Sequence, residues 1–188
     1  MSPRLPVLLM LLALPRAAAA QLCFRGQPLP HCTRFFVTSL GYSTRLNGGP
    51  GAQRHYLSGD VGLMTNQSVR TAVGATLFAG ALVDYDFQLR FGVKPRLRRW
   101  LGKRTSVELG AGPLITTGTG TRIGLTSDLA LNLADQLSLV TQWELLGNPN
   151  APDLGWYLGA RLGAKPAVWS GLVVGALLGI GAALYSGG

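Results

Sequence analysis

The chain has 188 residues, of which 47% are hydrophobic, 13% are charged and 26 are glycine. This length suits one domain, and the high apolar content excludes an intrinsically disordered chain. The formal net charge of +9 raises the question of nucleic-acid binding, but the export signal described next excludes that partner, because an exported chain does not routinely meet nucleic acid.

The first twenty residues are typical of a secretory signal peptide. Arg4 gives a basic start, residues 5–14 form a short apolar stretch, and Arg16 is followed by four alanines. This order predicts a signal peptide at residues 1–20, with Gln21 as the first mature residue. Its removal lowers the net charge from +9 to +7. An ordinary N-terminal helix is the alternative.

The only two cysteines, Cys23 and Cys32, lie in a short segment, residues 21–33, just before the first predicted strand. In the oxidising compartment that a signal peptide implies, a close pair of cysteines predicts a disulfide. Metal binding with the adjacent His31 is the alternative, although three ligands on one short segment make a weak site.

Eight segments then alternate apolar and polar side chains. The pattern is clearest in residues 85–93, where Tyr85, Phe87, Leu89, Phe91 and Val93 share one face. Side chains of a strand point to opposite faces with a period of two, so each segment predicts a strand with one apolar face. The predicted strands are residues 34–46, 53–64, 69–82, 84–94, 105–116, 121–133, 136–146 and 155–164.

Turn-forming residues separate most of these strands. If the N-terminus faces the periplasm, the first, third, fifth and seventh connections face outward. The outward connections at residues 47–52 and 147–153 are long, whereas the second and sixth connections are short. Long outer loops with short periplasmic turns are typical of outer-membrane barrels.

Alternation alone does not tell which face of a barrel points inward, because a soluble barrel of the lipocalin kind has its apolar face inside. The polar positions here are mostly glycine, serine, threonine and alanine with isolated charges, whereas a solvent-facing surface carries long lysine and glutamate side chains. The interior of an eight-stranded barrel is only wide enough to be filled by side chains. The polar face is therefore predicted to line the lumen.

The charged residues on that face number five of each sign, and we expect them to neutralise one another because an unpaired buried charge is costly. An ion path or a binding site is the functional interpretation, and a salt-bridged plug is the structural one, which the small lumen favours. The candidate lumenal charges are Arg45, Asp60, Arg70, Asp86, Arg90, Glu108, Arg122, Asp128, Glu144 and Arg161.

A cluster of basic residues occupies positions 94–104, between the fourth and fifth predicted strands. It predicts contact with anionic lipid head groups, with a tryptophan at the interfacial level. A solvated hairpin turn is the alternative interpretation. The predicted head-group residues are Arg96, Arg98, Arg99, Trp100, Lys103 and Arg104.

After the last strand, residues 165–188 include some twenty uncharged residues, enough to cross a bilayer as a helix. Gly171, Gly175, Gly179 and Ala183 recur every four residues, a small-residue stripe that allows close backbone approach. We expect a membrane-associated helix that packs beside the barrel or against a copy of itself; a further strand or a mobile tail is the alternative.

No set of residues predicts catalysis, a cofactor or a metal site. His55 and Ser58 are the only pair that could be nominated, and a spacing of three places them on opposite faces of a strand. The glycines near residues 110 and 118 are not followed by a helix, so they do not predict a phosphate-binding loop.

The signal peptide, the eight amphipathic strands and the outer loops together resemble the small outer-membrane β-barrel proteins of Gram-negative bacteria, the OmpA/OmpX-like group. The resemblance covers residues 34–164 and is architectural. It implies an all-β fold, an eight-stranded antiparallel up-and-down transmembrane barrel, here with an apolar C-terminal helix. It also implies location in the bacterial outer membrane, with lipid as the partner.

The leading hypothesis is therefore a non-enzymatic, integral outer-membrane protein with a structural or surface-interaction role and a closed, salt-bridged lumen. One alternative is a periplasmic, lipocalin-like carrier of an apolar ligand, tethered by the C-terminal helix. A narrow, porin-like channel is the other. Self-association through the C-terminal helix would be compatible with the leading hypothesis.

Overall fold

The computed structural model describes residues 22–48, 55–83, 87–118, 120–147 and 152–163, which contain nine strands and no helix. The strands are β1 (Leu22–Cys23), β2 (Arg34–Arg45), β3 (His55–Asn66), β4 (Thr71–Val83), β5 (Phe87–Trp100), β6 (Thr105–Thr117), β7 (Arg122–Leu133), β8 (Leu137–Leu146) and β9 (Asp153–Gly163). No helix among the described residues is long and apolar enough to cross a bilayer. The predicted signal peptide and C-terminal helix lie outside these residues.

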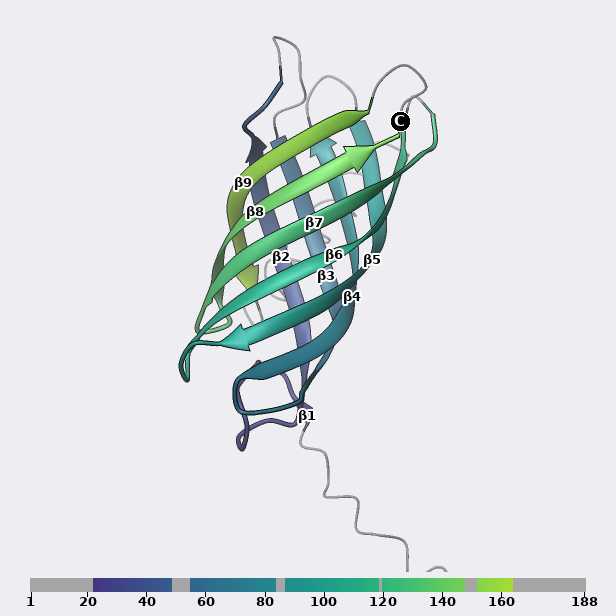
Figure 1. Cartoon of the computed structure of the whole chain (residues 1–188). Helices are drawn as coiled ribbons and strands as arrows, with labels where there is room; N and C mark the ends of the chain where they lie inside the picture. The colour runs from purple at the N-terminus through teal and green to yellow at the C-terminus, as the bar shows by residue number, and fades with distance from the viewer. Residues whose placement is uncertain (1–21, 49–54, 84–86, 119, 148–151, 164–188) are drawn as a thin grey trace, which may run out of the picture.

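Strands β2–β9 pair antiparallel in sequence order, and β2 also pairs with β9, which closes the sheet into a barrel (Figure 1). Each of these eight strands, β2–β9, is 10 to 14 residues long. The predicted all-β, eight-stranded antiparallel barrel is thus confirmed.

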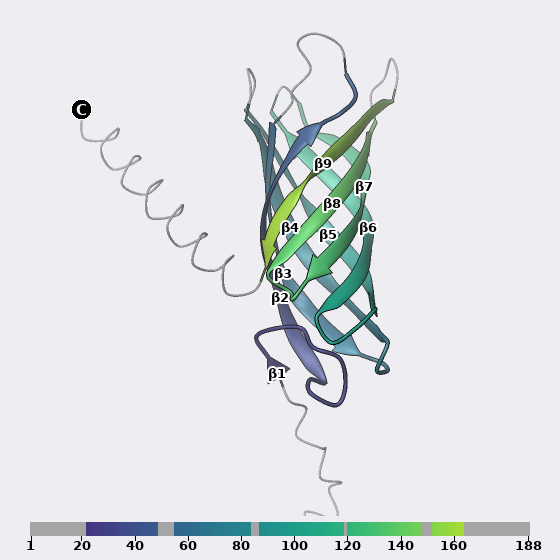
Figure 2. The same cartoon turned by 90° about the vertical axis from the view of Figure 1, so that its left-hand side faces the viewer.

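The two ends of the barrel differ. The β3–β4, β5–β6 and β7–β8 turns lie at one end of the barrel together with residues 22–33, low in Figure 1 and in Figure 2. We call this the closed end. Strands β2, β4, β6 and β8 finish at the opposite, far end. Consecutive antiparallel strands reverse direction each time, so even-numbered and odd-numbered connections are sorted to opposite ends.

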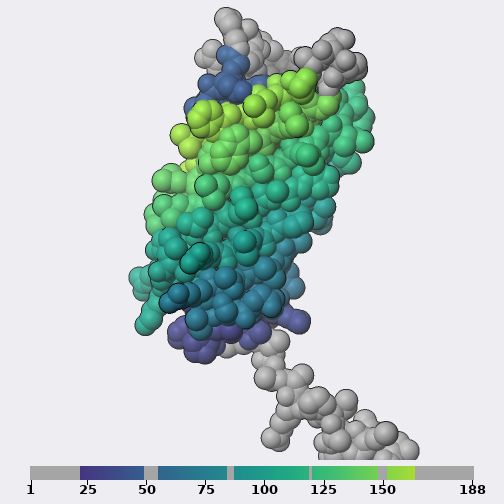
Figure 3. All heavy atoms as spheres, viewed as in Figure 1, coloured from purple at the N-terminus to yellow at the C-terminus, as the bar shows by residue number. Residues whose placement is uncertain are grey.

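The barrel wall is apolar outside and polar inside. On β4, the side chain of Leu77 is 64% exposed, whereas its neighbour Thr76 is 1% exposed. Leucines, valines and aromatic residues occupy outward positions on all eight strands. Figure 3 shows the side chains of successive strands packed side by side along one face of the barrel. The inward positions carry small, polar and charged residues. This is the orientation that the small polar-face residues predicted.

The two-residue strand β1 lies beside β2, next to the place where β2 and β9 close the barrel. The pairing of β9 with β2 ends at the Ser39–Gly163 pair, so the first residues of β2 extend past the end of β9. There β1 pairs with β2 in parallel, Leu22 opposite Arg34. This pairing gives Arg34 and Phe35 backbone partners on the side of β2 that pairs with β9 further along the strand.

Strand β5 is longer than predicted. The sequence predicted its end at Lys94, but the strand continues to Trp100 and the turn shrinks to residues 101–104. Pro95 lies where the β5–β6 pairing is interrupted, between the Gly92–Leu114 and Arg96–Gly110 pairs, and Pro113 of β6 lies in the same gap. A proline is tolerated in a sheet where its missing N–H is not needed for the ladder.

Two inward glycines allow β3 and β4 to approach closely. Gly62 lies opposite Thr76, and Gly74 lies opposite Met64. A Cβ atom at Gly62 would lie 2.1 Å from the carbonyl oxygen of Ala75, and one at Gly74 would lie 2.1 Å from that of Leu63. Any larger residue would therefore push the two strands apart.

Candidate functional site

The interior of the barrel is the first candidate site, because it collects charges from most of the strands. Strand β5 contributes four cations to it, since the period of two turns every second residue inward. Among the described residues, the interior holds five cations and five carboxylates that form ion pairs with one another: Arg90, Lys94, Arg96, Arg98 and Arg161 with Asp60, Glu108, Asp128, Asp135 and Glu144.

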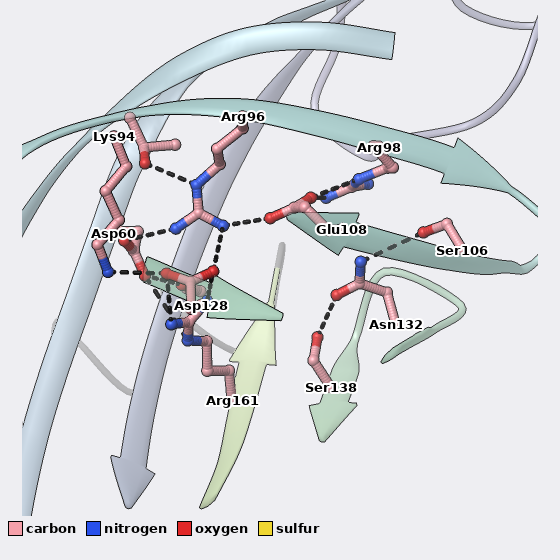
Figure 4. Close-up of polar contacts among 12 residues, drawn as sticks. Asp60, Lys94, Arg96, Arg98, Ser106, Glu108, Asp128, Asn132, Ser138 and Arg161 are labelled. Atoms are coloured by element: carbon pink, nitrogen blue, oxygen red, sulfur yellow. Dashed lines mark hydrogen bonds and ion pairs between the residues drawn. The ribbon is translucent and has the colours of Figure 1, made fainter. Parts of the chain in front are cut away.

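Arg96 lies at the centre of this network (Figure 4). Its guanidinium donates to Asp60 of β3 at 2.7 Å and also to Glu108 of β6. Its Nε donates to the hydroxyl of Thr76 on β4 at 2.7 Å. One planar side chain therefore links three neighbours through all its nitrogens, which is the geometry for which arginine is suited.

Asp128 of β7 is the second hub of the network. Lys94 of β5 donates to it at 2.8 Å, and Arg161 of β9 lies 3.1 Å from the same oxygen (Figure 4). Arg96 is 3.9 Å from its other oxygen. Asp128 of β7 thus links a cation of β5 to a cation of β9 inside the lumen.

Arg98 extends the network to the closed end. It pairs with Glu108 at 2.5 Å and with Asp135 of the β7–β8 turn at 2.9 Å. Its guanidinium also lies 5.1 Å from the ring centre of Phe35 and 5.3 Å from that of Trp100, within the range of cation–π attraction.

The far half of the lumen is filled by a third group. Arg90 forms an ion pair with Glu144 and donates to the hydroxyl of Tyr157 at 3.0 Å. Tyr157 packs against Tyr56, with ring centres 5.5 Å apart, in a cluster completed by Leu82. Charged and aromatic side chains therefore occupy the lumen together.

Residues 22–33 cap the closed end of the barrel. The backbone N–H of Gly26 donates to Asp135 at 2.8 Å, and Nε of Arg25 donates to the carbonyl of Ala134 at 2.8 Å. The amide of Asn66 donates to the carbonyls of Gln27 and Cys32 at 2.7 and 2.8 Å. These bonds hold the segment against the end of β3 and the β7–β8 turn.

The predicted disulfide is confirmed: Cys23 and Cys32 are bonded, with their Cα atoms 6.0 Å apart. Both thiols are used in this bond, so the alternative of metal binding with His31 is wrong. Cys32 is buried, and Cys23 packs against a cluster of Phe35, Met64 and Trp100 at the closed end. The sequence predicted the bond, but gave no sign that its loop covers the barrel.

The structure describes nine of the ten predicted lumenal charges and sorts these nine into three groups. Six lie in the interior: Asp60, Arg90, Glu108, Asp128, Glu144 and Arg161. Arg45 and Arg122 are half-buried near the far end, where Arg45 pairs with Asp153 at 2.7 Å. The prediction for Arg70 was wrong, because β4 begins at Thr71 and Arg70 lies exposed in the turn before it. Asp86 lies outside the described residues.

The predicted head-group residues also divide. Arg96, Arg98 and Trp100 are 4%, 2% and 6% exposed and point into the lumen, so their predicted contact with lipid head groups is wrong. Their inward direction follows from the continuation of β5 to Trp100. The other three, Arg99, Lys103 and Arg104, are exposed at the closed end.

Sequence reasoning missed Lys94 and Asp135 as members of the ion network. Lys94 continues the inward alternation of Arg90 and Gly92, so the pattern itself could have identified it. Asp135 lies in a turn, where the period of two gives no signal, and its backbone has a positive φ of 52°.

Two alternatives fail on this geometry. A carrier of the lipocalin kind needs an apolar cavity, whereas this interior is crossed by buried ion pairs and its apolar side chains face outward. His55 is exposed on the outer face, where it contacts Tyr42 at 2.5 Å, while Ser58 points inward. The one pair nominated for catalysis therefore does not meet.

No protein-family model matches this sequence, and no curated protein matches it at a significant level. Among solved structures, the backbone structure of the Yersinia pestis outer membrane protein Ail in a phospholipid bilayer nanodisc is similar to this chain. The TM-score is 0.42 at 11% sequence identity, over 68% of this chain and 97% of Ail.

Proposed function

We propose that this chain is an integral protein of the bacterial outer membrane, and that its barrel is a closed, non-enzymatic anchor. The observation that carries the proposal is the distribution of polarity: apolar side chains cover the outside of a closed barrel, and ion pairs fill its inside. In water such a surface would aggregate. In a bilayer it is what a transmembrane barrel requires.

Two further observations support the outer membrane over other membranes. The predicted signal peptide would export the chain, and the Cys23–Cys32 disulfide suits an oxidising compartment. The barrel is also closed, so each of β2–β9 has a hydrogen-bonded neighbour on both sides, as a strand in the hydrocarbon layer requires. Strands of 10 to 14 residues are long enough to cross it when tilted.

The closed end would face the periplasm, and the far end would face outward. The short β3–β4, β5–β6 and β7–β8 turns support this orientation, since periplasmic turns of such barrels are short. Arg99, Lys103 and Arg104 would then contact lipid head groups of the inner leaflet. The connections at the far end would be available for surface contacts.

The lumen would not conduct ions. A narrow channel would have to pass the layer in which Arg96 joins Asp60 and Glu108 and in which Asp128 joins Lys94 and Arg161. Opening that layer would separate buried opposite charges, which is costly. We therefore propose a structural or surface-interaction role for the barrel.

The apolar tail, residues 165–188, lies outside the described residues, and its membrane-associated helix stays a proposal. Its stripe of Gly171, Gly175, Gly179 and Ala183 would pack beside the barrel or against a second copy. A cysteine in place of Gly175 tests the second arrangement, because self-association would produce a cross-linked dimer in membranes.

Cell fractionation combined with gel mobility tests the proposal. The protein should be found in the outer-membrane fraction and should migrate faster in an unboiled sample than in a boiled one, because a folded barrel resists detergent until it is heated. Recovery in the soluble periplasmic fraction, with one mobility before and after boiling, would contradict it.

A further inference from the structure

A half-open pocket of about 240 Å³ lies at the closed end of the barrel. One wall is the disulfide loop, which contributes Arg25, Gly26, Gln27, Pro28 and His31. The other walls are the end of β5 with its turn, through Trp100, Lys103 and Arg104, and the β7–β8 turn, through Ala134 and Asp135. The pocket is therefore built where three segments, far apart in sequence, come together.

The pocket is strongly cationic. Lys103 and Arg104 are exposed and have no ion-pair partner in the part of the chain that the structure describes, and Arg25 donates only to a backbone carbonyl. Asp135 is the one acid that lines the pocket, and both its oxygens are engaged, by Arg98 and by the N–H of Gly26. Three positive charges therefore face the pocket with no available carboxylate to neutralise them.

The pocket also lies within a wider basic rim, defined as the exposed residues Arg34, Arg70, Arg99, Lys103 and Arg104 at the closed end. The described interior carboxylates are used in the ion network, and Asp153 pairs with Arg45 toward the far end. The described part of the closed end thus has unpaired cations only, in contrast to the charge-balanced lumen.

Exposed apolar residues lie close in sequence to the pocket residues. Leu101, two residues before Lys103, is 61% exposed, and Leu97 of β5 and Leu133, which precedes Ala134, are also exposed. If the barrel spans a membrane, this height is where acyl chains end and phosphates begin. A ligand that joins an acyl chain to an anionic phosphate matches both surfaces.

We infer that this pocket binds the phosphate group of an anionic phospholipid from the leaflet at the closed end, an inference that rests on the proposed membrane location. Lys103 and Arg104 supply the charge from the β5–β6 turn, and Arg25 supplies it from the disulfide loop. The acyl chains lie along Leu97 and Leu101. The disulfide holds one wall in place, so the site depends on the Cys23–Cys32 bond.

The test is a titration of the purified mature protein, folded in neutral detergent micelles, with phosphatidylglycerol and separately with phosphatidylcholine, followed by native mass spectrometry. The expected result is one tightly bound phosphatidylglycerol and no comparable binding of phosphatidylcholine. The double substitution Lys103→Gln and Arg104→Gln should weaken phosphatidylglycerol binding about tenfold or more, since a basic residue near a lipid phosphate contributes roughly 1 kcal/mol.

The matched control is Arg34→Gln with Arg70→Gln, which removes two cations from the same rim outside the pocket and should change the affinity less than about twofold. The substitutions Cys23→Ser and Cys32→Ser together should weaken binding as much as the Lys103/Arg104 double substitution does. Equal losses of affinity in the Lys103/Arg104 and Arg34/Arg70 variants would show diffuse electrostatic attraction and overturn the inference. Full displacement of the lipid by inorganic phosphate would indicate a free-anion site and would also overturn it.

Heat-dependent gel mobility of each variant separates this inference from the proposed function. A barrel that shows the mobility shift but binds both lipids alike contradicts the pocket alone. A chain that does not fold in micelles contradicts the membrane barrel itself.

Discussion

Lys94 and Asp128 meet inside the barrel at 2.8 Å, although their strands, β5 and β7, are separated by β6. Both side chains are buried. The pair shows how a narrow lumen lets side chains reach past the neighbouring strand, so that ion pairs connect parts of the wall that share no backbone hydrogen bonds. Ion pairs in the interior thus connect strands that are not neighbours in the sheet.

Asp128→Asn should strongly destabilise the barrel. The substitution leaves Lys94 and Arg161 buried without their main counter-charge, which is expected to cost about 3–5 kcal/mol in the free energy of unfolding. Urea unfolding in detergent micelles, followed by circular dichroism, measures this difference. Asp153→Asn is the control, because its partly exposed pair with Arg45 near the far end should contribute less than about 1 kcal/mol. Equal effects of the two substitutions would argue against a tightly coupled interior.

Gly62→Ala should also destabilise the barrel, by about 1–3 kcal/mol, because the added Cβ would overlap the backbone of β4. The measurement is the same urea titration, together with the yield of the faster-migrating folded form. Gly102→Ala serves as the control, since no atom lies within 4 Å of a Cβ at this turn position. If Gly62→Ala folds as well as Gly102→Ala, β3 and β4 do not approach as closely as described.

Reducing the disulfide should release the cap while the barrel stays folded. The bond spans nine residues in sequence, and its loss should cost about 2–3 kcal/mol, mainly in the local stability of the loop. Trypsin should then cut after Arg25 in the reduced protein and not in the oxidised one. Heat-dependent mobility should persist in both. Protection of Arg25 without the disulfide would mean that the hydrogen bonds to Asp135, Ala134 and Asn66 suffice to hold the cap.

The purified protein should give no stepwise ionic current in planar lipid bilayers. The ion layer around Arg96 and Asp128 fills the centre of the lumen, and aromatic clusters lie on either side of it. Recording over a range of voltages, with a known porin as a positive control, tests this. Regular conductance steps would contradict the closed lumen.

The period of two in the sequence predicted all eight barrel strands and six of the interior charges. The prediction succeeded because outward positions are apolar and exposed, whereas inward positions are small or polar and buried, so residue type alternates along every strand. Most strand ends were predicted within two residues. The direction of the apolar face could also be inferred, from the small size of the polar-face residues.

The prediction failed where two signals compete. Pro95 and the dense cations after it indicated a turn, yet Lys94, Arg96, Arg98 and Trp100 keep the inward alternation of β5. Their charges are neutralised by carboxylates of other strands and of one turn: Asp60, Glu108, Asp128 and Asp135. A short stretch of sequence does not show such pairs, because the two partners are distant along the chain. The cap could not be predicted either, since it is held by hydrogen bonds to Asn66, Ala134 and Asp135, which are distant in sequence.

Adjacent residues on opposite faces of the barrel wall give the most direct test of lipid outside and ion pairs inside. Single cysteines at Leu77 and Thr76, and at Leu125 and Thr126, would carry nitroxide spin labels in protein reconstituted into lipid vesicles. Labels at Leu77 and Leu125 should collide with oxygen dissolved in the hydrocarbon and not with a water-soluble nickel complex, whereas labels at Thr76 and Thr126 should be shielded from the oxygen. Oxygen access at Thr76 and Thr126, with shielding at Leu77 and Leu125, would contradict a barrel with lipid outside and ion pairs within.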